Sequence, residues 1–328
     1  MKILPLFIPQ QGCPFTCIYC NQVSITNSPN IDIDHFKVLI SNFCHKNKDT
    51  NKEIAYFGGT FTALEKNIQL DYFNLIKPYN SKIRGVRLST RPDCIDHNIL
   101  TFLRENHVST IELGIQSFSD RVLRSSGRGY LAEVAMNACK MIIDHGFDLI
   151  IQLMPGLPDD DRITFEETIK KTISLKPAGV RIYPTIVLKG TALEKIYHAG
   201  NYQPLELKET IQWLKDASKL LDKAHINILK LGLHSDLAPK DIIAGPFHPA
   251  IGELVKIEIL FDDITLNWIP EKTLQVSASA ISLFRGHDQL LLNKLKEHLL
   301  LDKIPIVINK EKKSPLYCFV NSEADKFW

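Results

Sequence analysis

The chain has 328 residues, 45% of them hydrophobic, and its 39 basic and 37 acidic residues give a formal net charge of +2. This length can build a large α/β core with a smaller extension, and the near-neutral balance neither requires nor excludes a nucleic-acid partner. Seven cysteines are too few, and odd in number, for a disulfide framework.

The N-terminal residues 1–9 are apolar but too short for a secretory signal, and they lack a small-residue cleavage site. No segment reaches the length of a membrane span, so we expect no membrane partner. Free cysteines fit a reducing compartment. The sequence therefore predicts a soluble, cytoplasmic protein.

Short strand patterns alternate with helical patterns through about residue 185. The expected strands are 3–8, 54–57, 83–89, 110–114, 149–154 and 179–183. The expected helices are 34–45, 64–76, 96–105, 131–144 and 164–175. Such alternation predicts parallel strands with crossover helices, although periodicity alone does not separate a partial barrel from an open two-sided sheet.

The alternation weakens after residue 185. Helical patterns cover 205–221, 253–261 and 288–300, and strand patterns cover 226–231, 273–277, 304–308 and 316–320. We expect two domains, a larger one at 1–234 and a smaller α+β extension at 235–328.

Three cysteines near the N-terminus, Cys13, Cys17 and Cys20, have the spacing C-x3-C-x2-C and follow Gly12. Iron–sulfur clusters held by cysteine normally take four thiolates, so three would leave one iron of a four-iron cluster open to another ligand. A structural zinc site usually has a second Cys/His pair downstream; His35 and Cys44 are nearby, but no second C-x2-C pair follows. Gly12 would allow the backbone to approach a cluster closely.

Polar or glycine-rich motifs follow the expected strands, at the carboxyl ends where barrel enzymes collect their functional groups. These motifs are Gly58-Gly59-Thr60, Ser89-Thr90-Arg91, Gln116-Ser117 and Met154-Pro155-Gly156. Each could contact a ligand, and the first two could also be ordinary turns. Their shared position relative to the strands favours a common site.

Several charged residues fall in or beside the strands. Glu112 in an apolar strand is costly unless it meets a partner or lines a cavity. Arg128 lies in a glycine-flanked loop and is a better candidate for binding a carboxylate or phosphate than Arg121, which could be on a solvated helix face. Arg181 and Tyr183 share one strand face, which lines the cavity or is a partly solvated strand end.

Other polar residues have weaker patterns. Asp159-Asp160-Asp161 fits a solvated loop and helix start better than a metal site. Cys94 follows a strand-end loop and could approach the site. His234 and His248 flank a Gly/Pro-rich segment and are substrate contacts or ordinary loop residues.

The motifs resemble those of radical S-adenosylmethionine (SAM) enzymes, and more narrowly the catalytic subunit of Elongator, which acts on the wobble uridine of tRNA. The resemblance covers about residues 1–260. It is carried by residues 12–21, 58–62, 89–93, 113–118, 153–158 and 180–184. Oxygen-independent coproporphyrinogen dehydrogenases are also similar around residues 116–118, but they usually have Gly-Gly-Gly-Thr-Pro-Thr where this chain has Gly-Gly-Thr-Phe-Thr.

The resemblance implies a partial (β/α)6 TIM-like barrel and a [4Fe–4S] cluster on Cys13, Cys17 and Cys20. It implies that SAM binds the open iron and is cleaved reductively to a 5′-deoxyadenosyl radical, with electrons from a donor such as flavodoxin or ferredoxin. The implied cofactor-binding residues are Tyr19, Gly58, Gly59, Thr60, Ser89, Arg91, Gln116, Arg128 and Met154. The side chains that act catalytically on the substrate stay unknown.

The substrate stays open at this point. The Elongator subunit carries an acetyltransferase domain, and this chain shows no acetyl-CoA signature, so carboxymethylation-type chemistry is not expected to carry over. One hypothesis is an enzyme acting on a tRNA nucleoside, with lysines between residues 189 and 230 meeting phosphates or forming a solvated helix face. The others are an enzyme for a small metabolite or tetrapyrrole, and a non-catalytic cluster-bearing protein.

Overall fold

The computed structural model describes residues 2–8, 11–14, 17–21, 33–46, 50–233, 237–310, 316–321 and 326–327. The chain divides into two compact units, one formed by residues 1–213 and 220–249, the other by residues 214–219 and 250–328. The expected domain boundary at residue 234 stays a prediction. Each unit is described by itself.

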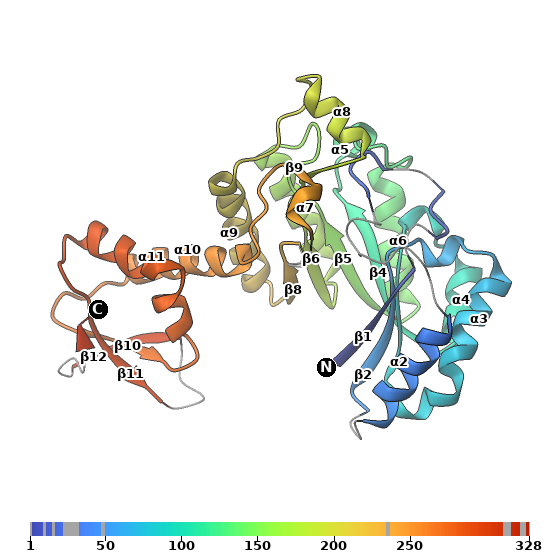
Figure 1. The fold of residues 1–328 in the computed structure, drawn as a ribbon, viewed down its shortest axis with the longest axis horizontal. Helices are drawn as coiled ribbons and strands as arrows, with labels where there is room; N and C mark the ends of the chain where they lie inside the picture. The colour runs from blue at the N-terminus through green and yellow to red at the C-terminus, as the bar shows by residue number, and fades with distance from the viewer. Residues whose placement is uncertain are drawn as a thin grey trace. The chain divides into compact units, whose positions relative to one another are not determined.

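The first unit is built on a seven-stranded parallel sheet in the order β1-β2-β3-β4-β5-β6-β8 (Figure 1). Its strands are β1 (Lys2–Phe7), β2 (Lys52–Phe57), β3 (Gly85–Thr90), β4 (Val108–Gln116), β5 (Asp148–Leu153), β6 (Gly179–Ile182) and β8 (Ile228–Leu231). The predicted partial barrel is confirmed. It has a seventh strand, because the strand expected at 226–231 joins the sheet as β8.

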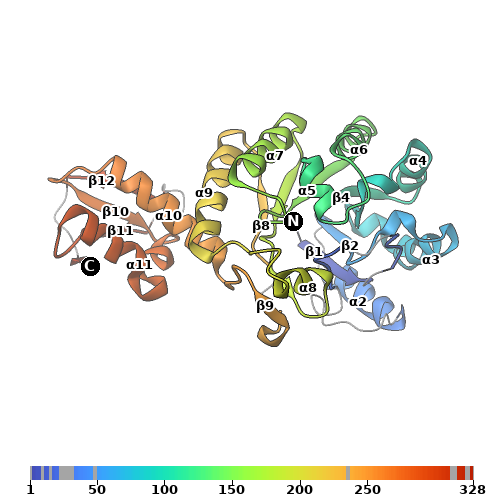
Figure 2. The same ribbon diagram turned by 90° about the horizontal axis from the view of Figure 1, so that it is seen from above.

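Helices connect consecutive strands, as the alternating pattern predicted. They are α2 (Ile33–His45), α3 (Lys66–Ile76), α4 (His97–Glu105), α6 (Ala132–Asp144) and α7 (Arg162–Leu175). Figure 2 shows them along the outer side of the curved sheet. Asp96 and Asp161 cap the starts of α4 and α7 by accepting from the backbone N–H three residues on.

Strand residues divide between the two faces of the sheet with period two. One face is apolar and packs under the helices, with Ile54, Leu88 and Ile111 fully buried. On the concave face the register places Ala55 beside Arg87, and Ser89 beside Glu112. The inside of this barrel is therefore polar, whereas the interior of a closed barrel is usually packed with branched apolar residues.

The sequence patterns missed several short elements. These are α5 (Asp120–Ser125), α8 (Ala192–His198) and the two-stranded antiparallel ribbon of β7 (Val187–Leu188) and β9 (Ile242–Ala244). Helix α9 (Leu207–Lys223) was expected.

The second unit contains a four-stranded mixed sheet in the order β12-β10-β11-β13, which confirms an α+β extension. Its elements are α10 (Ile251–Leu266), β10 (Thr273–Ser277), α11 (Ile281–Leu299), β11 (Pro305–Asn309), β12 (Tyr317–Val320) and β13 (Lys326–Phe327). Helix α11 is interrupted at residues 286–289 by non-helical backbone. The hydrophobic core of the second unit includes Leu274, Val276, Phe284 and Ile306.

Among the helices that the structure describes, none combines the length and apolar character needed to cross a bilayer.

Candidate active site

A cavity of about 680 Å³ opens inside the curve of the sheet, where the strands end. It gathers every residue predicted to hold a metal or cofactor. They are Cys13, Cys17, Cys20, Tyr19, Gly58, Gly59, Thr60, Ser89, Arg91, Gln116, Arg128 and Met154. The predicted common site at the carboxyl ends of the strands therefore exists, and the role of each residue stays a prediction.

Two glycines dock the cysteine loop on the loop after β2. A Cβ on Gly59 would overlap the Gln11 carbonyl and lie 2.9 Å from the Ile8 carbonyl. Gly12, at φ +71°, would likewise overlap the Thr60 carbonyl. The Thr60 N–H donates to the Gln11 carbonyl at 2.8 Å. In the structure Gly12 lets two protein loops meet, and its expected role in the approach to a cluster stays a prediction.

Two guanidiniums converge on the buried sulfur of Cys17. Arg128 donates through Nη1 to Cys17 Sγ at 3.1 Å and to the Tyr19 hydroxyl at 3.2 Å. Arg91 reaches the same sulfur at 3.6 Å and pairs with Asp93 at 2.9 Å. Two positive charges beside one sulfur offset negative charge on it. Arg128 is also held inside the protein by the Gly114 carbonyl and the Tyr130 hydroxyl.

Gln116 adds an unsatisfied group to the cavity wall. Its backbone has φ +73°, and its Oε1 is buried with no hydrogen-bond partner among the described residues. An unpaired buried acceptor costs about 1–3 kcal/mol. A donor on a bound molecule would satisfy it.

The donor set fits a cluster better than a single metal ion. Within the described parts of the chain, no three His, Cys, Asp or Glu side chains are grouped closely enough to hold one ion. A cluster takes each thiolate on a different iron, so its ligands stand further apart. The thiols of Cys13, Cys17 and Cys20 open on one cavity, beside Arg91 and Arg128. These residues therefore fit a cluster with three protein ligands.

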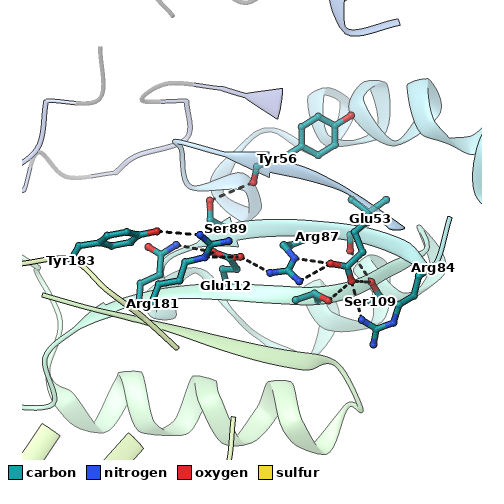
Figure 3. Close-up of polar contacts among 12 residues, drawn as sticks. Glu53, Tyr56, Arg84, Arg87, Ser89, Ser109, Glu112, Arg181 and Tyr183 are labelled. Carbon is teal, nitrogen blue, oxygen red and sulfur yellow. Dashed lines mark hydrogen bonds and ion pairs between the residues drawn. The ribbon is translucent and has the colours of Figure 1, made fainter. Parts of the chain in front are cut away.

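Deeper in the barrel, ion pairs cross the concave face of the sheet (Figure 3). We call the set Glu53, Arg87, Glu112, Gln152 and Arg181 the floor network. Arg87 joins both carboxylates, donating through Nε to Glu53 at 2.7 Å and through Nη1 to Glu112 at 2.8 Å. Glu112 also accepts from Gln152 Nε2 at 3.1 Å and pairs with Arg181 Nε at 3.1 Å.

The far end of the floor network is anchored at Glu53, which is fully buried. Its carboxylate also accepts from Arg84 Nη1 at 3.2 Å, Ser109 Oγ at 3.0 Å and Thr110 Oγ1 at 2.7 Å. The sequence identified Glu112 as needing a partner or a cavity, and it has both. Glu53 and Arg87 were not identified as site residues from the sequence. Both lie an even number of positions from cavity-lining residues of the same strand, Phe57 and Ser89, so they share the inward face.

Other predictions had mixed outcomes. Arg181 and Tyr183 both line the cavity, as one alternative had it. Asp161 caps α7 and pairs with exposed Arg121, as expected for a solvated acid. Asp160 lies in the expected loop but is only partly exposed: burial raises its pKa to about 7, while it accepts from the Gly156 N–H at 2.9 Å.

The remaining candidates contribute less. Burial raises the pKa of Cys94 to about 11, and Cys94 is not in the described lining of the cavity. His248 is likewise outside that lining, and His234 falls outside the described residues.

Comparison with known proteins places these motifs in a family. The model of the radical SAM superfamily matches residues 7–172, and that of the radical SAM C-terminal domain matches residues 177–260. An uncharacterized protein of Methanocaldococcus jannaschii is 29% identical over 74% of this chain and 73% of its own length.

Two further relatives have names that state an activity or a complex. The tRNA uridine(34) acetyltransferase of M. jannaschii is 27% identical over 63% of this chain, and mouse Elongator complex protein 3 is 26% identical over 49%. The chain spans less than half of each, 42% and 33%.

Solved structures agree on the fold. An archaeal Elp3 from Methanocaldococcus infernus superposes with a TM-score of 0.63 at 19% identity, covering 80% of this chain and 63% of that one. Coproporphyrinogen III oxidase from Escherichia coli superposes with a TM-score of 0.51 at 19% identity, covering 68% and 53%.

Proposed function

This chain belongs to the radical SAM superfamily and is a radical SAM enzyme; from that premise we propose that it binds a [4Fe–4S] cluster and SAM and acts on a tRNA nucleoside. The bound cluster would supply an electron that cleaves SAM to methionine and a 5′-deoxyadenosyl radical. The observation that carries the proposal is the meeting of three thiols with all the other predicted cofactor-binding residues in one cavity.

The chain's own residues have separate tasks in this proposal. Cys13, Cys17 and Cys20 would ligate three irons, leaving the fourth for SAM. Gly58-Gly59-Thr60 would bring backbone groups close to the amino acid part of SAM, as in the superfamily. Arg91 and Arg128 offset negative charge at the sulfur end.

Other lining residues would orient the bound SAM. Tyr19 would lie near its adenine and Met154 would contact the same end. Ser89 would contact its ribose or carboxylate. Gln116 would accept a hydrogen bond from it through the Oε1 that the protein leaves unpaired.

Two observations support a tRNA substrate. One is the similarity to a tRNA uridine(34) acetyltransferase, of which this chain spans 42%, so its acetyl transfer is not part of the proposal. The other is a set of exposed lysines available to phosphates, namely Lys189, Lys195, Lys208 and Lys223. A small reducing protein such as flavodoxin or ferredoxin would supply the electron.

Anaerobic reconstitution tests the cofactor chemistry. We expect protein loaded with iron and sulfide to show cluster absorption, and to form 5′-deoxyadenosine when reduced with SAM present. Cluster loading without any 5′-deoxyadenosine would support the non-catalytic hypothesis instead.

Nucleoside analysis tests the substrate. Bulk tRNA from a deletion strain should lack or accumulate a modified nucleoside compared with the parent strain. Affinity for tRNA should also fall with rising salt if lysines meet phosphates. An unchanged nucleoside profile would favour a small metabolite or tetrapyrrole.

A further inference from the structure

The floor network reaches the cavity at a second polar point, away from the sulfur end. Gly114, whose carbonyl holds Arg128, and Glu112 both lie on β4. Glu112 is two residues earlier, which places it about 7 Å deeper in the barrel. Glu112, Gln152, Arg181 and Tyr183 all line the cavity. The cofactor proposal uses none of them.

Arg181 is held so that part of its guanidinium is left for a ligand. Its Nε pairs with Glu112 at 3.1 Å, and its guanidinium carbon lies 5.6 Å from the Phe57 ring centroid. Nη1 makes a long contact of 3.4 Å to the Tyr183 hydroxyl, and Nη2 has no partner in the described structure. An arginine fixed through Nε presents its terminal donors in a rigid direction.

Gln152 supplies an acceptor beside this donor. Its Nε2 lies 3.1 Å from Glu112 Oε2. An ionised carboxylate only accepts, so the amide nitrogen must point at Glu112 and Oε1 must point away from it. Arg181 and Gln152 are therefore both held by the Glu112 carboxylate. Towards the cavity, Arg181 presents a hydrogen-bond donor and Gln152 presents an acceptor.

The charge of the floor network selects the kind of ligand. Arg87 and Arg181 are balanced by Glu53 and Glu112, and all four side chains are at most 15% exposed. Arg84, the third arginine on Glu53, is balanced by its own ion pair with Asp148. An oxyanion bound at Arg181 would add a negative charge that these groups do not offset, at a high cost in a buried site. A neutral ligand with a carbonyl oxygen adds none.

We propose that Arg181 and Gln152 recognise a lactam edge of the substrate, meaning a ring carbonyl next to a ring N–H. The carbonyl accepts from Arg181, and the N–H donates to Gln152 Oε1. Glu112 positions both side chains without touching the ligand. This inference rests on the proposed function in that the ligand is the substrate, and the uracil ring of a tRNA uridine has such an edge.

The test is an equilibrium measurement on the SAM-loaded, reconstituted protein without reductant, so that no turnover is needed. The probes are anticodon stem-loop RNAs with uridine or 3-methyluridine at the wobble position, and the two free nucleosides. Methylation at N3 removes the N–H and blocks Gln152. We expect wild-type protein to bind the uridine probe about 10- to 100-fold more tightly.

Two variants and a matched control locate this preference. Arg181→Lys keeps a cation for Glu112 but loses the planar fork, and Gln152→Met removes the acceptor with little change in volume. Gln152→Met should bring the two affinities to within about twofold, with uridine losing most. Arg181→Lys should weaken the binding of both probes, because both keep the ring carbonyl, and Arg84→Lys should weaken neither. Arg84→Lys alters the same network at Glu53, outside the cavity lining, and should keep the preference. Thermal unfolding of each variant confirms that it is folded.

Each outcome decides a separate point. A preference for uridine seen only with free nucleosides supports lactam recognition and contradicts a tRNA substrate. Equal binding of both probes by wild-type protein, or equal losses of affinity in Arg84→Lys and Arg181→Lys, overturns the proposal. Failure to form 5′-deoxyadenosine would overturn the proposed function while leaving this binding result intact.

Discussion

The cavity has two polar regions that are built in different ways. The sulfur end comes from loops, and its three cysteines lie within eight positions of one another in the sequence. The floor network comes from β2, β3, β4, β5 and β6, and its hydrogen bonds join residues 25 to 69 positions apart. The first region depends on a local motif and on loop docking. The second depends on strand register.

The largest expected effect is at the sulfur end. Cys17→Ala should abolish 5′-deoxyadenosine formation, a loss of at least about 1,000-fold, because two thiolates hold a cluster poorly. The same is expected for Cys13→Ala and Cys20→Ala. Iron content and product formation after anaerobic reconstitution measure it.

Cys318→Ala is the matched control, because this thiol lies in β12 of the second unit and should be dispensable. Turnover retained without Cys17 would show that the sulfur end is not the cluster site.

Substitutions in the floor network should lower the stability of the protein rather than its SAM cleavage. Glu53→Ala leaves Arg87 with one carboxylate instead of two and removes the acceptor of Ser109 and Thr110. We expect it to lower the free energy of unfolding by about 3–5 kcal/mol. Denaturant unfolding of the cluster-free protein measures this.

Arg121→Ala breaks an ion pair whose side chains are 58% and 52% exposed, and it should cost less than about 1 kcal/mol. Equal losses of unfolding free energy in Glu53→Ala and Arg121→Ala would mean that the buried ion pairs are no stronger than a surface pair.

Docking of the cysteine loop can be broken by one methyl group. Gly59→Ala places a Cβ against the Gln11 and Ile8 carbonyls, so the two loops must separate. We expect a loss of about 1–3 kcal/mol and reduced iron loading. Gly286→Ala, which meets no atom within 4 Å, is the control and should change neither. Normal iron loading in Gly59→Ala would separate docking from cluster binding.

The smallest effect concerns Asp160, which accepts from the backbone N–H groups of Gly156 and Asp161, whereas the floor carboxylates accept from guanidiniums. Burial raises its pKa to about 7, above the value of about 3.9 in an unfolded chain. The folded state therefore holds this proton more tightly. Its stabilising contribution is complete below about pH 4 and is lost as the pH rises through about 7.

Asp160→Asn should remove this pH dependence. Asp160 is partly exposed, so solvent screening reduces the effect of its pKa shift. The difference in unfolding free energy between variant and wild type should grow in favour of the variant by about 1–2 kcal/mol from pH 4 to pH 8. Urea titrations at several pH values measure it. A constant difference across that range would mean that Asp160 titrates normally.

The cavity lining could be predicted from the sequence because the motifs that mark it are local. Gly58-Gly59-Thr60 and Gln116 each directly follow or end an apolar strand, and strand ends meet in a parallel sheet. The pairing of Glu53 with Arg87 could not be read in this way, because it requires knowing which strands are neighbours and in which register. Helices α5 and α8 were missed because fewer than three turns give little periodic signal.

The partial burial of Asp160 was not predicted, for a different reason. Three consecutive carboxylates indicate a solvated segment, yet the turn before α7 encloses the middle one. The Tyr202 hydroxyl, which donates to the Gly156 carbonyl at 2.6 Å, closes over the same turn. Sequence separation of more than 40 residues hides such a contact.

The strand order of the first unit bears on how the protein is made. Along the sheet the strands follow their order in the chain, with β7 alone set aside in the ribbon. A nascent chain can therefore extend the sheet one strand at a time, each new strand pairing with the edge left by the previous one. Arg128, whose guanidinium covers the sulfur of Cys17, is synthesised 111 residues after that cysteine. Until Arg128 has been made, the thiol of Cys17 therefore lacks the cover that it has in the folded barrel.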